Sequence, residues 1–309
     1  MKICFIIDQI SQPRCLKRID SIYFENIPLC VHGFDNGLYN ENTRNKPYNI
    51  QSCRINHIGF SLSNFFRKCR YIRNVIKKLD NDDIIYLFGF NIALIAFFFK
   101  GNHKYFYEEA DLGYLRSKPI IRRILKSIDT FLMKHSEVTI LTSQGFIEYL
   151  NKDASKSLSG KVILLPNKLN DYFVDKTRTT SFITNNSIKF SFVGLIRYPN
   201  TVLRFARVIG ESFSDHEFHF YGDGPSAGEA KQLADKYSNI FYHGSFRSPF
   251  DLGEIYNKTD VNIACYDTTS HNVKLAEPNK LYESIFFGKP IVVSKETFLA
   301  ERVEMMDAG

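Results

Sequence analysis

Short strand-like runs alternate with helical segments along nearly the whole chain, and this alternation limits the possible folds more than any other feature. The runs are rich in β-branched and aromatic residues, and turn residues separate them from the helical segments. A strand–helix–strand repeat favours parallel strands with helices on both faces of the sheet, so the sequence predicts an α/β fold. The predicted strands are residues 2–8, 29–33, 83–89, 104–109, 138–142, 162–165, 188–194, 217–221, 240–244, 261–266 and 290–294.

One weakly apolar, turn-rich stretch interrupts the pattern at residues 168–187, where polar residues dominate. Such composition is typical of a linker. At 309 residues and 44% hydrophobic content, the chain is long and apolar enough for two domains of ordinary size. The sequence therefore predicts two doubly wound Rossmann-like domains, at 1–167 and 188–309, that face each other across a ligand cleft.

The formal charge of +7 fits phosphate-bearing small molecules, anionic membranes or nucleic acid. Basic and aromatic residues are not interleaved in a recognition motif, which argues against nucleic acid.

Residues 65–79 combine an apolar stripe with basic residues on the other faces. They form either a packed helix with a solvated basic face or a helix that lies on an anionic membrane surface.

The cysteines and the N-terminus suggest a reducing cytoplasm as the location of the protein, with peripheral contact to the inner membrane face left open. The six cysteines include no CxxC pair, and no paired histidine spacing accompanies them, so we expect neither a zinc site nor a disulfide framework. The chain opens as a strand and not as a signal peptide. Residues 84–99 are apolar but shorter than a membrane span, which predicts a strand followed by a buried helix.

The segment richest in chemistry runs from Glu277 to Pro290. Pro278 and Asn279 predict a helix start, with Asn279 as the cap, and Gly288 predicts the helix end. Free amides at such a start favour a diphosphate, and Lys280 adds a full positive charge. Glu283 lies on the same helix face, where a carboxylate can accept hydrogen bonds from ribose hydroxyls.

Residues 278–283, Pro-Asn-Lys-Leu-Tyr-Glu, followed by Gly288-Lys289-Pro290, resemble the donor-binding motif of GT-B glycosyltransferases of the family 4 type. The resemblance implies that Glu283 binds the donor ribose. It also implies that the preceding loop and helix start, with Glu277, Asn279, Lys280 and Leu281, bind the diphosphate side of the donor.

Further segments resemble the same family in order and spacing. Residues 192–197 resemble the glycine-rich strand end that opens the second domain, so Gly194 and Arg197 are implied to meet the donor phosphates. Residues 218–225 resemble the family's Tyr-Gly-Asp-Gly-Pro strand end at Gly222. Residues 241–246 resemble the loop that cradles the base, which implicates Gly244 and Ser245, and residues 164–167 resemble the turn between domains.

Three features depart from the family. The family often carries a second glutamate eight positions before the first, but Leu275 stands there, and the nearest acid is Glu277. A lysine expected a few residues after Arg197 has no match. The family normally continues for several dozen residues beyond the equivalent of Gly309, so we expect a C-terminal domain that is truncated.

On the acceptor side, residues 107–113 follow a predicted strand and contain Glu109 and Asp111. Active-site residues of open α/β sheets collect at such strand ends, so either acid can orient an acceptor hydroxyl or act as a general base. The alternative is a cluster of acids that caps a helix. Residues 9–18, with Arg14 and Arg18, also face the cleft by topology and can meet an anionic acceptor.

The resemblance implies transfer of a sugar, hexosyl or related, from a nucleoside diphosphate sugar to a hydroxyl of a glycan or lipid-linked acceptor in surface polysaccharide or glycolipid synthesis. It implies retention of anomeric configuration. Arg197, Lys280 and helix amides would stabilise the departing diphosphate without a metal ion or other cofactor. Two alternatives stay open: a catalytically inactive nucleotide-sugar-binding partner and a GT-B sugar-nucleotide epimerase.

Overall fold

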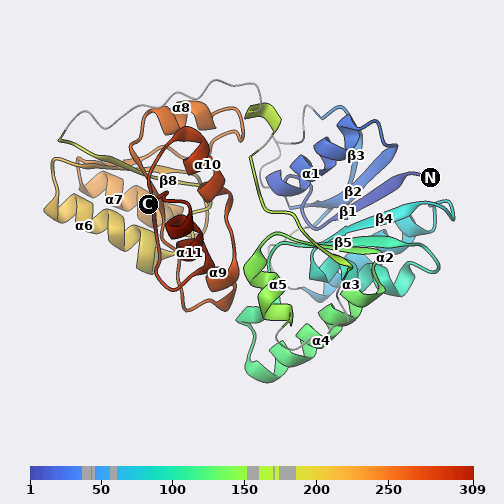
Figure 1. The fold of residues 1–309 in the computed structure, drawn as a ribbon. Helices are drawn as coiled ribbons and strands as arrows, with labels where there is room; N and C mark the ends of the chain where they lie inside the picture. The colour runs from blue at the N-terminus through green and yellow to red at the C-terminus, as the bar shows by residue number, and fades with distance from the viewer. Residues whose placement is uncertain (37–42, 44–45, 56–60, 152–159, 170, 174–185) are drawn as a thin grey trace. The chain divides into compact units, whose positions relative to one another are not determined.

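The protein consists of two compact units, residues Met1–Pro166 and Asn167–Gly309 (Figure 1). The computed structural model describes residues 1–36, 43, 46–55, 61–151, 160–169, 171–173 and 186–309. Most of the predicted linker at 168–187 lies outside these residues.

The first unit contains a parallel sheet whose strand order is β3-β2-β1-β4-β5-β6-β7. The order turns back on itself between β1 and β4, which is the arrangement of a Rossmann-like sheet. The elements in chain order are β1 (Ile3–Ile7), α1 (Pro13–Phe24), β2 (Leu29–Asp35), β3 (Ile50–Arg54), α2 (Leu62–Ile76), β4 (Ile84–Phe88), α3 (Phe90–Phe99), β5 (Tyr105–Glu109), η2 (Gly113–Arg116), α4 (Pro119–His135), β6 (Val138–Leu141), α5 (Gln144–Asn151) and β7 (Val162–Leu164).

Helices cover both faces of this first sheet. Val31 of β2 packs in one apolar cluster with Cys15 and Ile19 of α1. The ring of Phe34, which points to the opposite face because strand side chains alternate, lies 5.5 Å from the ring of Tyr71 on α2. Helix α3 packs against both α2 and α4. A sheet covered in this way buries its central strands, and every residue of β1 is buried.

The second unit repeats the topology in a smaller parallel sheet of order β10-β9-β8-β11-β12. The order reverses between β8 and β11. The elements in chain order are η3 (Asp171–Phe173), β8 (Lys189–Val193), η4 (Pro199–Leu203), α6 (Arg204–Ser212), β9 (Glu217–Tyr221), α7 (Ala227–Lys236), β10 (Ile240–Tyr242), α8 (Leu252–Asn257), β11 (Val261–Ala264), α9 (His271–Leu275), α10 (Asn279–Phe287), β12 (Ile291–Val293) and α11 (Phe298–Met305).

Two layers of helices enclose the second sheet. On one face, Phe192, Phe218 and Phe220 form a core with α6 and α7. On the other, Val193 and Tyr221 pack with α8 and with Phe287 of α10. Each unit is thus a helix–sheet–helix sandwich, as the alternating sequence pattern predicts.

The predicted strands are confirmed to within a few residues, and one strand was missed. Strand β3, with the sequence Ile-Gln-Ser-Cys-Arg, lies at the edge of the first sheet and is half exposed, so it lacks a continuous apolar run. The apolar residues 84–99 form β4 and α3, as expected. Within the described parts of the chain, no helix combines the length and apolarity that a membrane span requires.

The amphipathic helix predicted at 65–79 begins and ends three residues earlier, as α2. Ile72 and Ile76 are buried as expected, but Phe65 is exposed and Val75 takes its place in the core. The packed-helix interpretation therefore holds for the C-terminal half of α2, and the N-terminal half presents apolar side chains to solvent.

Candidate functional site

Glycines end three neighbouring strands of the second unit, in a row across its sheet. Gly194 follows β8, and its amide donates to the carbonyl of Tyr221, at the end of β9, at 2.8 Å. Gly222 follows β9, and its amide donates to the carbonyl of Gly244 at 2.7 Å. The three glycines have positive φ angles of 132°, 143° and 75°, which residues with a side chain rarely adopt.

The contact between the first two loops leaves no room for a side chain. A Cβ at Gly222 would lie 1.9 Å from the carbonyl oxygen of Gly194. The next residues extend this contact, since the amide of Ile196 donates to the carbonyl of Asp223 at 2.9 Å. The Gly-Asp-Gly segment therefore packs backbone against backbone on the loop after β8. Gly222 is required for this close approach, and its predicted donor contact remains a prediction.

Lys280 reaches the point where the strand order of the second sheet reverses. Its ammonium donates to the carbonyl of Ile263 on β11 at 3.2 Å and lies 3.1 Å from the ring centre of Phe192 on β8. Its Cε would be 3.7 Å from a Cβ at Gly194. Ligands of open α/β sheets bind at this reversal, just beyond the strand ends.

Lys280 is only 5% exposed, and this burial lowers the pKa of its ammonium well below the ordinary value. Burial thus opposes the full positive charge that the sequence predicts for Lys280. A carbonyl and aromatic rings stabilise the ammonium less than a carboxylate does, whereas a bound anion would raise its pKa.

Glu283 lies one turn further along α10 and is held by a buried tyrosine. The Tyr256 hydroxyl donates to Glu283 Oε2 at 2.8 Å, and Asn262 donates to the same hydroxyl at 3.1 Å. The carboxylate raises the pKa of Lys280 by its charge, although burial has the larger, opposite effect. Lys280 and Glu283 thus project from one helix face into one region, as the spacing predicts.

The start of α10 differs from the prediction by one residue. Pro278 and not Asn279 occupies the cap position, and a proline side chain accepts no hydrogen bond from the helix amides. Asn279 is the first helical residue and is exposed. Leu281 is fully buried in a core cluster with Ile291 and Leu299, so its side chain is not at a ligand surface. The predicted helix end at Gly288, with φ 62°, is confirmed.

Arg197 and Ser245 are exposed on the loops after β8 and β10. The Arg197 guanidinium lies 5.1 Å from the ring centre of Tyr198, and that ring lies 5.6 Å from Tyr266. Tyr266 in turn lies 5.4 Å from the Lys280 ammonium. Two aromatic rings therefore join the exposed Arg197 to the buried Lys280 in a continuous group of side chains.

Known proteins resemble the chain only distantly in sequence. No protein-family profile matches the chain. The succinoglycan biosynthesis protein ExoL of Rhizobium meliloti (strain 1021) is 23% identical over 257 residues, which cover 79% of this chain and 63% of that protein.

Solved structures resemble nearly the whole chain. The lipopolysaccharide outer core galactosyltransferase WaaB matches 96% of this chain and 81% of its own, with a TM-score of 0.61 and 16% identity. Anabaena HepE, solved with UDP and glucose, matches 98% of this chain and 83% of its own, with a TM-score of 0.69 and 15% identity. The protein has the GT-B fold.

The GT-B fold is not confined to sugar transfer. A putative UDP-N-acetylglucosamine 2-epimerase from Listeria monocytogenes matches 99% of this chain and 81% of its own, with a TM-score of 0.58 and 15% identity. At these identities the likeness establishes the fold, and the reaction depends on the residues of the site.

Glu277, the candidate substitute for the missing upstream glutamate of the GT-B motif, is engaged inside the second unit. It is buried, accepts a hydrogen bond from the Tyr282 hydroxyl, and lies 3.9 Å from the Arg302 guanidinium. These contacts account for its burial without a ligand, so its donor contact remains a prediction with no further support.

Glu109 of the first unit belongs to a buried network and not to an exposed surface. It is 3% exposed. The Tyr107 hydroxyl lies 2.7 Å from Glu109 Oε2 and 2.6 Å from Asp129 Oδ1. A hydroxyl carries one proton, so the second short contact needs a proton on one of the carboxyls. Burial raises the pKa of both acids, that of Asp129 to about 6. The structure does not support Glu109 as a solvent-facing base.

The neighbouring acids form ion pairs with the arginines of α1. Arg18 binds both oxygens of Glu108, at 3.0 and 3.3 Å, and Arg14 binds Asp111 at 3.0 Å. The two arginines therefore have protein partners, and their contact with an anionic acceptor remains a prediction. Neither Glu109 nor Asp111 caps a helix, because Leu112 and Lys118 hold those positions. Asp111 is the partly exposed acid and keeps the predicted acceptor role as an open prediction.

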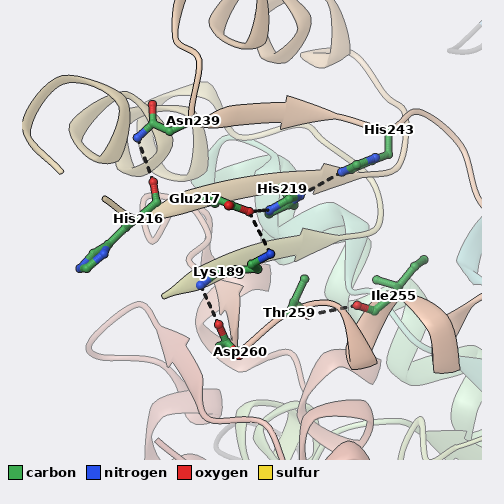
Figure 2. A network of polar contacts seen from close by, with 9 residues as sticks. All are labelled: Lys189, His216, Glu217, His219, Asn239, His243, Ile255, Thr259 and Asp260. Atoms are coloured by element: carbon green, nitrogen blue, oxygen red, sulfur yellow. Dashed lines mark hydrogen bonds and ion pairs between the residues drawn. The ribbon is translucent and has the colours of Figure 1, made fainter. Parts of the chain in front are cut away.

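Sequence reasoning missed a polar line that crosses the second sheet toward the Gly244 loop (Figure 2). His243 Nε2 lies 3.0 Å from His219 Nδ1, and His219 Nε2 lies 2.9 Å from Glu217. Glu217 also pairs with Lys189 at 3.4 Å. The alternation of β9 places Glu217 and His219 on one face, which would have identified half of the line, but the contact with His243 depends on strand pairing.

Proposed function

We propose that this protein is a glycosyltransferase that moves a sugar from a nucleoside diphosphate sugar, with UDP as the carrier, to a hydroxyl of a growing polysaccharide. The observation that carries the proposal is the convergence of Gly194, Lys280 and Glu283 at the strand reversal of the second unit. Close backbone approach, a buried cation and an oriented carboxylate are what a diphosphate attached to a ribose requires.

The proteins that resemble this chain support the same proposal, independently of the geometry of the site. WaaB is a galactosyltransferase, HepE was solved with UDP and glucose, and ExoL is a succinoglycan biosynthesis protein. The chain matches 63% of the length of ExoL, so the activity and substrates of the whole protein belong to the proposal. A hexose as the transferred sugar, retention of configuration and independence from metal ions at the donor site are parts of it as well.

In the proposed mechanism the leaving diphosphate accumulates negative charge beside Lys280. The nearby anion raises the pKa of the Lys280 ammonium and so stabilises its charged form when the donor is present. Arg197 lies at the exposed end of the same aromatic group, from which it would contact the outer phosphate. A buried cation stabilises such charge more than an exposed one, because water screens it less.

The test is a binding titration with UDP, GDP, CMP and UDP-sugars on wild type and Glu283→Gln. We expect one nucleoside diphosphate to bind and to raise the melting temperature. Loss of the ribose contact should weaken that binding by roughly 10- to 100-fold, the effect of a hydrogen bond to a charged group. The matched control is Glu304→Gln, an exposed acid on α11 of the same unit.

Equal affinity in Glu283→Gln and wild type would contradict the proposed donor site. Binding that depends on Glu283, without transfer of sugar to any glycan, would favour the inactive-partner alternative. Isomerisation of the sugar nucleotide without an acceptor would favour the epimerase.

We further propose that the first unit contacts an anionic membrane through α4 and the start of α2. Ile120 is 78% exposed, Ile124 is 55% exposed, and the exposed Arg123 lies between them on α4. On α2, Phe66 is 67% exposed beside the exposed Arg67. Exposed apolar side chains mixed with basic ones are typical of a helix at a membrane interface.

Flotation with liposomes that contain anionic lipid tests this contact. Wild type should float with them, and Ile120→Glu/Ile124→Glu should stay in the soluble fraction, because two carboxylates oppose both burial and surface charge. Val208→Glu, at an exposed apolar position on α6 of the second unit, is the matched control. Equal flotation of all three proteins would refute the proposed membrane surface.

A further inference from the structure

Three metal-ligating side chains meet in the first unit, although the sequence shows no metal-binding spacing. Cys4 of β1 and Cys30 of β2 are direct partners in the parallel register of the two strands. His32 follows on the same face of β2, because strand side chains alternate. The two Sγ atoms and one ring nitrogen of His32 all lie within 4.8 Å of one another.

A second layer of contacts holds the imidazole of His32. The Tyr71 hydroxyl of α2 donates to the carbonyl of Gln51 at 3.0 Å and lies 3.3 Å from His32 Nδ1. Its single proton is used on Gln51, so toward His32 the hydroxyl can only accept. Nδ1 therefore carries the ring proton, and Nε2 keeps the lone pair that a metal ion needs. Metal-binding histidines are commonly oriented in this way.

The group lies near the amino ends of β1 and β2, since Cys4 and Cys30 are each the second residue of their strand. Active sites of open α/β sheets collect at the carboxyl ends, so the group is separate from the acceptor-side residues. Cys4 is fully buried, whereas Cys30 and His32 are half-buried. The group is thus anchored in the core and open to an ion from solvent.

We propose that Cys4, Cys30 and His32 bind a borderline or soft transition-metal ion, with Zn²⁺ as the expected occupant. Two thiolates and an imidazole suit Zn²⁺ or Cu⁺ and are poor ligands for Mg²⁺ or Ca²⁺. Three protein ligands leave the fourth tetrahedral position to water or to another ligand. The ion would join β1 to β2 and, through Tyr71, to α2. The scattered cysteines alone gave the opposite expectation.

The test is a Zn²⁺ titration of the full chain, reduced and freed of metal, against a chromophoric chelator. Wild type should bind one Zn²⁺ per chain. Cys30→Ser should remove competition with the chelator, and Tyr71→Phe should weaken binding by roughly 10- to 100-fold, as loss of an outer contact does. Cys69→Ser, a half-buried cysteine of α2 outside the group, is the matched control.

Cobalt supplies a second readout that reports the ligands directly. Co²⁺-loaded wild type and Cys69→Ser should show thiolate-to-cobalt charge-transfer absorption, and Cys30→Ser should lose most of it. His32→Gln replaces Cys30→Ser if the latter lacks wild-type circular dichroism.

Three results would overturn the proposal. The first is the absence of stoichiometric Zn²⁺ binding, and the second is equal Zn²⁺ affinity in wild type, Cys30→Ser and His32→Gln. The third is a Cys4–Cys30 disulfide in protein kept under cytoplasmic reducing conditions, since it would consume both thiolates. Preferential binding of Cu⁺ over Zn²⁺ would confirm the site and change the occupant.

Discussion

The two units share one strand topology but differ in the charges at their strand ends. In the first unit, the acids at the end of β5 and just after it pair with arginines of α1 or share a proton through Tyr107. In the second, glycines end β8, β9 and β10, and a buried lysine donates to a carbonyl and lies against aromatic rings. These acids and arginines of the first unit have partners within the protein, whereas Lys280 gains most from an anion that the protein must acquire.

Because of this difference, we expect the charged residues of the first unit to matter for stability and Lys280 of the second unit to matter for ligand binding. Loss of one partner of a buried ion pair strongly destabilises the protein, because the other charge stays buried without a partner. A buried cation whose nearest contacts are neutral lowers the stability of the protein without ligand. The same cation contributes to the affinity when an anionic ligand binds.

The largest expected effect is on the stability of the first unit. Arg18→Met leaves the 2%-exposed Glu108 without its arginine and should destabilise the protein by about 3 to 5 kcal/mol. Arg14→Met, one turn earlier on α1, should cost about 1 kcal/mol or less, because its partner Asp111 is 42% exposed. Urea denaturation measures both. Equal losses for the two variants would mean that burial of the pair does not decide its contribution.

The next effect is on binding, in the second unit. Lys280→Met should weaken binding of the nucleoside diphosphate by roughly 10- to 100-fold, because a charged contact to phosphate is lost. Its stability should equal or exceed that of wild type, since an apolar side chain replaces a buried ammonium. Calorimetric titration and thermal melts test the two halves, with the exposed Lys258→Met as control. A large loss of stability would place Lys280 among the structural charges.

The smallest effect is a pH dependence of opposite sign in the two units. Burial raises the pKa of Asp129 to about 6, above its unfolded value near 4, so the first unit should lose stability as pH rises through this interval. Burial lowers the pKa of His219 and of His243 below the unfolded value, so the second unit should lose stability as pH falls below about 6.5.

Melting curves from pH 4 to 8 for wild type, Asp129→Asn and His219→Gln measure this dependence. Asp129→Asn should reduce the loss on the alkaline side, and His219→Gln should reduce the loss on the acidic side. Unchanged pH profiles in both variants would show that other groups control the titration.

Local residue patterns in the sequence determined much of the secondary structure of this protein. The alternation of apolar strands with helices specified two parallel sheets, because a strand buried on both faces needs a continuous apolar run. The span from Pro278 to Gly288 specified α10 nearly to the residue, because proline and glycine restrict the backbone directly. Lys280 and Glu283 were placed on one face because the helix period fixes their spacing.

Tertiary structure alone decided how those side chains are surrounded. It buried Lys280 against Phe192, placed Glu109 beside Asp129, and paired Arg14 and Arg18 with acids some 90 residues away. It also brought Cys4 beside Cys30, and His219 beside His243. These contacts join residues on different strands and helices. Their proximity follows from strand order and register, which a local sequence pattern does not encode, and burial then set the charge that each group carries.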